Sequence, residues 1–91
     1  MTLEEAREKI DVIDKDLREL FLKRMAVSAE IAEIKAKTGD EIYKPEREAM
    51  LIEKLTADVD EKMKPMYISF IKKILSLSRE YQYKVMKDKD I

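Results

Sequence analysis

The sequence has 91 residues, a net charge of −1, no cysteine and no histidine, and nearly equal shares of apolar (45%) and charged (43%) residues. This length predicts one small domain, and the missing residue types exclude disulfides, thiolate chemistry, the usual zinc sites and Ser–His or Cys–His nucleophile pairs. Interspersed charges, an acidic amphipathic N-terminus and the lack of a long apolar run favour a cytoplasmic protein that binds neither nucleic acid nor membranes.

A long first helix is predicted over residues 2–37. Thr2 and Glu5 have the spacing of a capping box, and Gly39, the only glycine, is a typical helix stop. Between them, apolar residues recur at steps of three and four, which is the period of a packed helix face. That stripe consists of Leu3, Ala6, Ile10, Ile13, Leu17, Leu20, Val27, Ile31 and Ile34.

The length of this helix predicts a dimer. About 36 residues with a rise of 1.5 Å each span roughly 54 Å, whereas a compact monomer of this size is roughly 30 Å across. A helix that extends beyond its own domain leaves apolar surface uncovered, and a second copy of the chain would cover it. We therefore expect an all-α homodimer in which two long helices pack on each other.

Two shorter helices follow. Pro45 is a favourable first residue for the second helix, although Lys44 before it cannot cap the helix as Asp, Asn or Ser would. The polar stretch 56–64 predicts a break, and Pro65 opens the third helix. With only two prolines and one glycine, the chain predicts three helices and no sheet. We expect the charged end after Met86 to fray.

Polar residues interrupt the faces that should be buried. Arg24 replaces an apolar residue in the stripe of the first helix, and Arg7 and Lys35 lie beside that stripe. In the third helix, Ser78 and Gln82 interrupt the apolar face one turn apart. Any one of them alone is better explained as a group that fixes register, or as a lysine that extends to solvent. Together, the cations would be costly to bury without an anionic ligand, and two arginines suit two carboxylates.

Geometry limits which of these cations meet. Arg24 and Lys35 are three turns apart on one face, roughly 16 Å along the axis, so their long side chains can converge on one ligand. Arg7 is roughly 25 Å from Arg24 along the same helix and cannot reach that pocket in its own chain. In an antiparallel dimer, Arg7 of the neighbour can complete the site, which predicts two equivalent sites.

The ordered set of Arg7, Arg24, Lys35, Pro45-Glu46-Arg47-Glu48 and Ser78-x-x-x-Gln82 resembles the all-α (AroQ-class) chorismate mutases, from Leu3 to about Lys84. The resemblance implies one type II domain over residues 1–91, an intertwined dimer, and rearrangement of chorismate to prephenate without metal or cofactor. It also implies that the partner's Arg7 and Arg24 hold the substrate carboxylates with help from Ser78. Lys35 and Gln82 would contact the ether oxygen, and Arg47 and Glu48 would serve the ring hydroxyl.

One position departs from the family, which often has Asp where this chain has Lys44. We treat Lys44 as a candidate binding residue. Two other functions stay open: an isochorismate–pyruvate lyase of the same fold, and a non-catalytic helical dimerisation or regulatory module. The sequence also leaves open whether the chain is free-standing or one domain of a longer enzyme.

Overall fold

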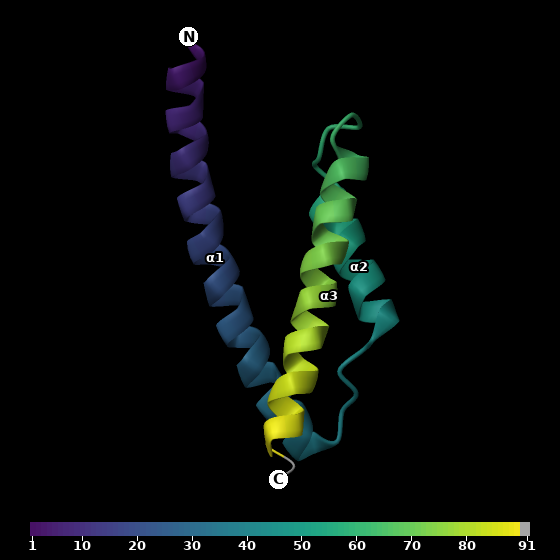
Figure 1. Ribbon diagram of the computed structural model, residues 1–91. Coiled ribbons are helices and arrows are strands. Elements are labelled where there is room, and N and C mark those ends of the chain that lie inside the picture. Colours follow the sequence, from purple (N-terminus) through teal and green to yellow (C-terminus); the bar gives the residue numbers. More distant parts are fainter. Residues whose placement is uncertain (90–91) are drawn as a thin grey trace.

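The computed structural model describes residues 1–89 and consists of three α-helices joined by short connections (Figure 1). They are α1 (Leu3–Thr38), α2 (Pro45–Thr56) and α3 (Lys64–Lys89), and residues 1–89 contain no strand. The predicted all-α fold with a very long first helix is confirmed. Over the same residues, no helix combines the length and the apolar character needed to cross a membrane.

The ends of α1 follow the local sequence. The Thr2 hydroxyl accepts the Glu5 backbone N–H at 3.1 Å, which is the predicted cap. The Glu5 carboxylate accepts from the Thr2 hydroxyl and not from the expected backbone N–H, so the capping box is closed through side chains. Gly39 ends the helix with φ of +80°, and its N–H donates to the Lys35 carbonyl at 2.8 Å.

The other two helices begin and end close to the predicted positions. Lys44 gives α2 no side-chain cap, as expected, and Pro45 is the first helical residue. The Thr56 hydroxyl donates to the Ile52 carbonyl at 2.7 Å in the last turn of α2. The third helix begins one residue before Pro65. Our expectation of fraying after Met86 is wrong for residues 87–89, which continue the helix; residues 90–91 lie outside the described part of the chain.

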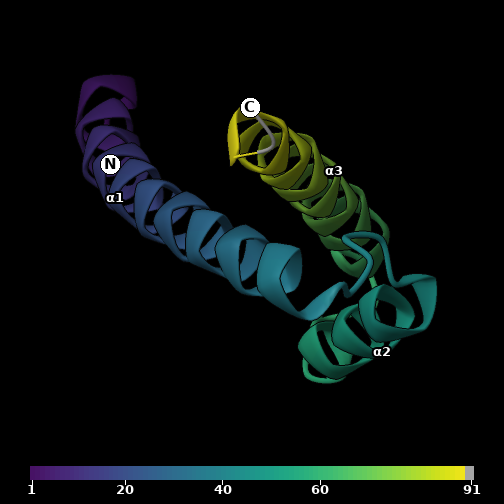
Figure 2. The same cartoon turned by 90° about the horizontal axis from the view of Figure 1, so that it is seen from below.

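The helices meet at one end of the molecule. Figure 1 shows α1 and α3 together where α1 ends, and separating toward the N-terminus, while α2 lies beside α3. Figure 2, a view from below, shows the connection after α1 leading across to α2. The buried apolar residues come from α1, the connection and α3, and they are Ala32, Ile42, Ile71 and Leu75. The core is therefore small and lies at the closed end.

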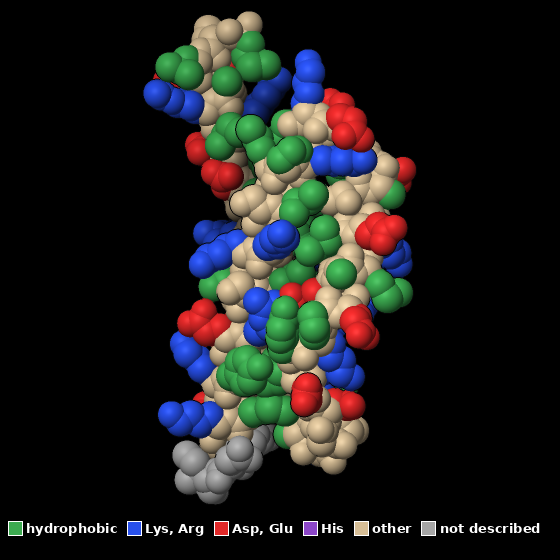
Figure 3. Space-filling model, turned by 90° about the vertical axis from the view of Figure 1, so that its right-hand side faces the viewer, with side chains coloured by type: hydrophobic (Ala, Val, Ile, Leu, Met, Phe, Trp, Pro, Cys, Tyr) green, Lys and Arg blue, Asp and Glu red, His purple; other side chains and the backbone are tan. Residues whose placement is uncertain are grey.

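The N-terminal part of α1 is not covered by its own chain. Every residue from 7 to 23 is exposed, including Ile10, Ile13, Leu17 and Leu20, whose exposed fractions are 46–61%. The molecule measures 54 × 27 × 14 Å and its radius of gyration is 16.5 Å, against roughly 12 Å for a compact chain of this length. On the side of the molecule that carries α2, Figure 3 also shows hydrophobic side chains exposed among the charged ones. A single chain thus leaves much of its apolar surface in water.

Candidate active site

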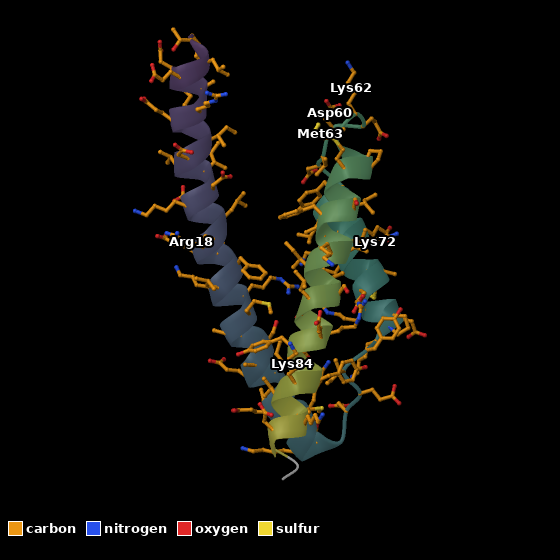
Figure 4. All side chains as sticks on the ribbon, viewed as in Figure 1. Arg18, Asp60, Lys62, Met63, Lys72 and Lys84 are labelled. Atoms are coloured by element: carbon orange, nitrogen blue, oxygen red, sulfur yellow. The ribbon has the colours of Figure 1, made fainter. Side chains whose placement is uncertain are left out.

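A cavity of about 280 Å³ lies where α1, α2, α3 and the connection between α1 and α2 come together. Figure 4 shows side chains of α1 and α3 pointing toward one another where these two helices approach. Its apolar wall consists of Val27, Ile31, Ile42, Leu51 and Leu75. Its polar lining consists of Arg24, Ser28, Lys44, Arg47, Glu48, Ser78, Arg79 and Gln82. Most of the predicted site residues are therefore brought to one place.

A buried polar group joins α1 to α3 at this cavity. The hydroxyls of Ser28 and Ser78 are 2.7 Å apart, and the Gln82 amide Nε2 donates to Ser78 Oγ at 3.2 Å. All three residues are 4–7% exposed. Ser78 and Gln82 share a face of α3 because four residues make about one turn. The prediction that these two polar residues lie one turn apart on one face of the helix is confirmed.

Gln82 has unused hydrogen-bonding capacity. Its Oε1 is buried without a partner among the described residues. A buried polar atom left unpaired costs about 1–3 kcal/mol, so a donor on a bound molecule would be favourable here. If the amide turns by 180°, Oε1 can accept the Ser78 hydroxyl and Nε2 takes the place of the unpaired oxygen. Gln82 can thus offer a ligand either an acceptor or a donor.

Lys35 reaches the connection that forms one side of the cavity. Its ammonium donates to the backbone carbonyl of Ile42, a lining residue, at 3.0 Å. Burial lowers the pKa of Lys35 below 10.5, and the Lys44 ammonium lowers it further, whereas the Asp40 and Glu48 carboxylates raise it. Lys35 is half-buried and is not among the residues that line the cavity. In a single chain, its side chain therefore lies behind the lining.

Glu48 is held from the third helix. Its Oε1 accepts from the Arg79 guanidinium, and the Arg79 Cζ lies 4.7 Å from the centre of the Tyr43 ring. The pair is about three-quarters buried, since the exposed fractions of the two side chains are 28% for Arg79 and 20% for Glu48. The start of α2, the connection and α3 are tied together by these contacts.

The remaining predicted residues differ in position. Arg24 is half-buried in the lining, and Arg47 lines the cavity from the exposed first turn of α2. Lys44 also lines it and forms an exposed ion pair with Asp40, with 3.5 Å between Nζ and Oδ1. Arg7 is exposed near the other end of α1 and is not part of the lining. The expectation that Arg7 cannot reach the site of its own chain agrees with this placement.

Charge in the lining is strongly unbalanced. Four cations, Arg24, Lys44, Arg47 and Arg79, face the cavity, while Glu48 is the acid among its lining residues. Glu48 is already paired with Arg79, and Lys44 forms the exposed ion pair with Asp40, so Arg24 and Arg47 are the lining cations best placed to bind an anionic ligand. The cavity is therefore suited to a small molecule with more than one negative charge.

Sequence reasoning missed two of the polar lining residues, Ser28 and Arg79. Ser28 lies seven residues before Lys35, which is about two turns and thus the same side of α1, and that spacing could have identified it. Arg79 lies three residues before Gln82, which places it on the flank of the polar face of α3. Its partner Glu48 is 31 residues away on another helix, and no periodicity could reveal that contact.

The fold and the cavity define the class of protein: a small all-helical domain with a cation-lined cavity between its three helices. The sequence pattern of the chorismate mutase type II family matches residues 6–83, and the chain belongs to this family. It is similar to the T-protein of Enterobacter agglomerans, with 46% identity over 46 residues, which are 50% of this chain and 12% of that protein.

The T-protein of Haemophilus influenzae is 35% identical over 51 residues, 56% of this chain and 14% of that protein. This chain thus spans about an eighth of the length of these relatives. No solved structure gives a significant match. Family membership supports chorismate mutase activity for this domain, which is an isomerase activity of aromatic amino acid biosynthesis.

Proposed function

We propose that this domain rearranges chorismate to prephenate in the cavity between its three helices. The observation that carries the proposal is the family match over residues 6–83 together with the buried Ser28–Ser78–Gln82 group in a cation-lined cavity. The rearrangement is intramolecular and needs no proton transfer to the protein. Catalysis then depends on holding a folded conformer of the substrate and on donors aimed at the oxygen that gains negative charge.

Two arginines are proposed to hold the two substrate carboxylates. Arg24 is in the lining and its guanidinium can form paired hydrogen bonds with a carboxylate. Arg7 of the neighbouring chain is proposed to supply the second. Ser78, whose hydroxyl already lies between Ser28 and Gln82, is proposed to assist one of these carboxylates.

Lys35 and Gln82 are proposed to stabilise the ether oxygen as the C–O bond breaks. The Gln82 amide offers Nε2 when it turns as described above, and the Lys35 ammonium would exchange the Ile42 carbonyl for the substrate. Donors of this kind in a water-excluded site stabilise charge that develops only in the transition state. Because both act on that charge, removal of either should lower kcat more than it raises KM.

The start of α2 is proposed to bind the ring hydroxyl. Glu48 can accept a hydrogen bond from this hydroxyl, and Arg47 and Lys44 add positive charge at the same edge of the cavity. Lys44 takes a place where the family often has Asp. Its ammonium already forms an exposed ion pair with Asp40, so we assign Lys44 to substrate binding and not to the chemical step.

A homodimer is proposed because of the uncovered stripe on α1. Burial of Ile10, Ile13, Leu17 and Leu20, each about half exposed, would contribute roughly 3–6 kcal/mol per chain. A second, mostly apolar cavity of about 730 Å³ lies between α1, α2 and α3, and Leu20 and Phe70 are among its lining residues. Arg24 lines both cavities. An antiparallel α1 from a second chain in the apolar cavity would bring the partner's Arg7 toward Arg24.

Mixed dimers test this arrangement. Chains with Arg7→Ala and with Arg24→Ala are expected to be nearly inactive alone, but co-refolded mixtures should regain about a quarter of the wild-type activity. Half of the dimers are then mixed, and each has one intact site. The matched control is a mixture of Arg24→Ala and Lys35→Ala chains, which should regain nothing because both residues serve the same site from the same chain. Recovery in the control mixture, or none in the first, would contradict the proposed dimer.

Two alternatives remain distinct from this proposal. An isochorismate–pyruvate lyase of the same fold would release pyruvate, and product analysis separates it from a mutase. A non-catalytic dimerisation or regulatory module would bind no dianion. Saturation of a true site at about 100 times its Kd should stabilise the fold by about 2.7 kcal/mol, which such a module would not show. The cytoplasmic location expected from the sequence stays a prediction.

A further inference from the structure

Arg79 is the charged lining residue that the mechanism above leaves without a role. It follows Ser78 directly on α3, so it projects from the helix that carries the polar group of the site. Its guanidinium donates to Glu48 on α2 and lies over the ring of Tyr43 in the connection. One side chain thus joins three elements around the edge where the ring hydroxyl is proposed to bind.

Without this contact, Glu48 would have other partners. Arg24, Lys44 and Arg47 line the same cavity, and the Glu48 carboxylate is close enough to Lys35 to raise its pKa. A free glutamate in such surroundings can rotate toward any of these cations and neutralise a group that must meet the substrate. In the structure, Arg79 engages this carboxylate from the third helix instead.

We infer that Arg79 is a positioning residue, which holds Glu48 in the orientation that accepts the substrate hydroxyl and keeps it away from the substrate-binding cations; this rests on the proposed mutase function. Arg79 donates to Oε1, and an ionised carboxylate has about four acceptor positions, so Glu48 retains capacity for a hydroxyl. The Tyr43 ring covers the guanidinium and limits its rotation.

The test is a double-mutant cycle on steady-state kinetics. Arg79→Met should raise KM for chorismate about tenfold, with a much smaller change in kcat. An effect of this size corresponds to the interaction energies that are common between residues in direct contact. In a Glu48→Gln background, where the carboxylate charge is gone but an acceptor oxygen remains, Arg79→Met should change KM by less than twofold. Arg79→Lys should fall between wild type and Arg79→Met, since it keeps the charge but loses the planar fork.

Lys72→Met is the matched control. Lys72 is an exposed cation on α3, seven residues before Arg79, and is labelled in Figure 4. The Lys72→Met substitution removes one positive charge from the same helix at a position that does not line the cavity. The KM of this variant should therefore equal that of the wild type. Thermal unfolding of all variants separates positioning from folding, because a purely structural role would lower Tm and the active fraction while KM stayed unchanged.

Each outcome decides the inference. An Arg79→Met effect on KM that disappears in the Glu48→Gln background supports it. An equal effect in both backgrounds, an effect on Tm and kcat alone, or no effect would overturn it while leaving the mutase function in place. An inactive wild-type chain would instead contradict the proposed function itself, and this is visible before any variant is made.

Discussion

Removal of the Ser78 hydroxyl is expected to destabilise the fold through the two groups that it leaves behind. Ser78 lies between Ser28 Oγ at 2.7 Å and Gln82 Nε2 at 3.2 Å, and both of those residues are less than 8% exposed. In Ser78→Ala, neither group has another hydrogen-bond partner among residues 1–89. The substitution also removes the contact that holds the Gln82 amide in place.

The size of the effect follows from this geometry. Each stranded buried polar group costs about 1–3 kcal/mol, and the lower end applies because the adjoining cavity can admit water. We expect a loss of about 2 kcal/mol, out of a total of roughly 5–14 kcal/mol for a chain of this length. The Ser28→Ala/Ser78→Ala double variant should lose about 1 kcal/mol less than the sum of the single variants, since the two hydroxyls pair with each other.

Urea unfolding at one fixed protein concentration measures these values, because the stability of a dimer depends on concentration. The transition midpoint should fall in Ser78→Ala without a change in slope. Ser69→Ala, at an exposed position of α3, is the control and should stay within about 0.5 kcal/mol of the wild type. A Ser78→Ala protein as stable as that control, or additive Ser28 and Ser78 effects, would refute the reasoning.

Four further predictions concern Lys35, its charged neighbours and the end of α1. Lys35→Ala should lower kcat by about 10²–10³, as removal of a donor to a developing oxyanion does, and near-native turnover would contradict its assigned role. Lys35 carries its positive charge only when protonated, and burial lowers its pKa. The rate should therefore stay level near neutral pH and begin to fall on the alkaline side at a pH below 10.5. Asp40→Asn removes a charge that raises this pKa and should move the alkaline limb to lower pH, whereas Lys44→Gln should move it to higher pH; a pH–rate profile with unmoved limbs would contradict the origin of the shift. Gly39→Ala should destabilise by about 1 kcal/mol in a denaturant titration, because φ is +80° although no atom lies within 4 Å of an added Cβ; an unchanged stability would show that this helix end relaxes freely.

The sequence was sufficient for the helices because their signals are local. Pro45 marks the start of α2, Gly39 ends α1 with the expected left-handed conformation, and the three-and-four spacing marks the long helix. The pairing of Ser78 with Gln82 was also accessible, since four residues bring two side chains to one face of a helix. These features depend on neighbours within a few residues along the chain.

The remaining features depend on how separate helices dock. The contact of Ser28 with Ser78 spans 50 residues, and that of Arg79 with Glu48 spans 31, so neither follows from a repeat. Arg79 also follows a serine and precedes a glutamate, in a pattern typical of a solvated helix face. The continuation of α3 over residues 87–89 has a local cause instead, because Lys is a good helix former.

The central claim is that this cavity isomerises chorismate, and incubation of the purified protein with chorismate tests it most directly. The loss of the enolpyruvyl ultraviolet absorbance is followed, and the product is then identified. We predict rapid loss of absorbance with prephenate as the product. Release of pyruvate would indicate the lyase instead, and no loss at any protein concentration, with the dimer intact, would contradict the claim and leave Arg24 and Gln82 as polar residues that only set the register of the helices.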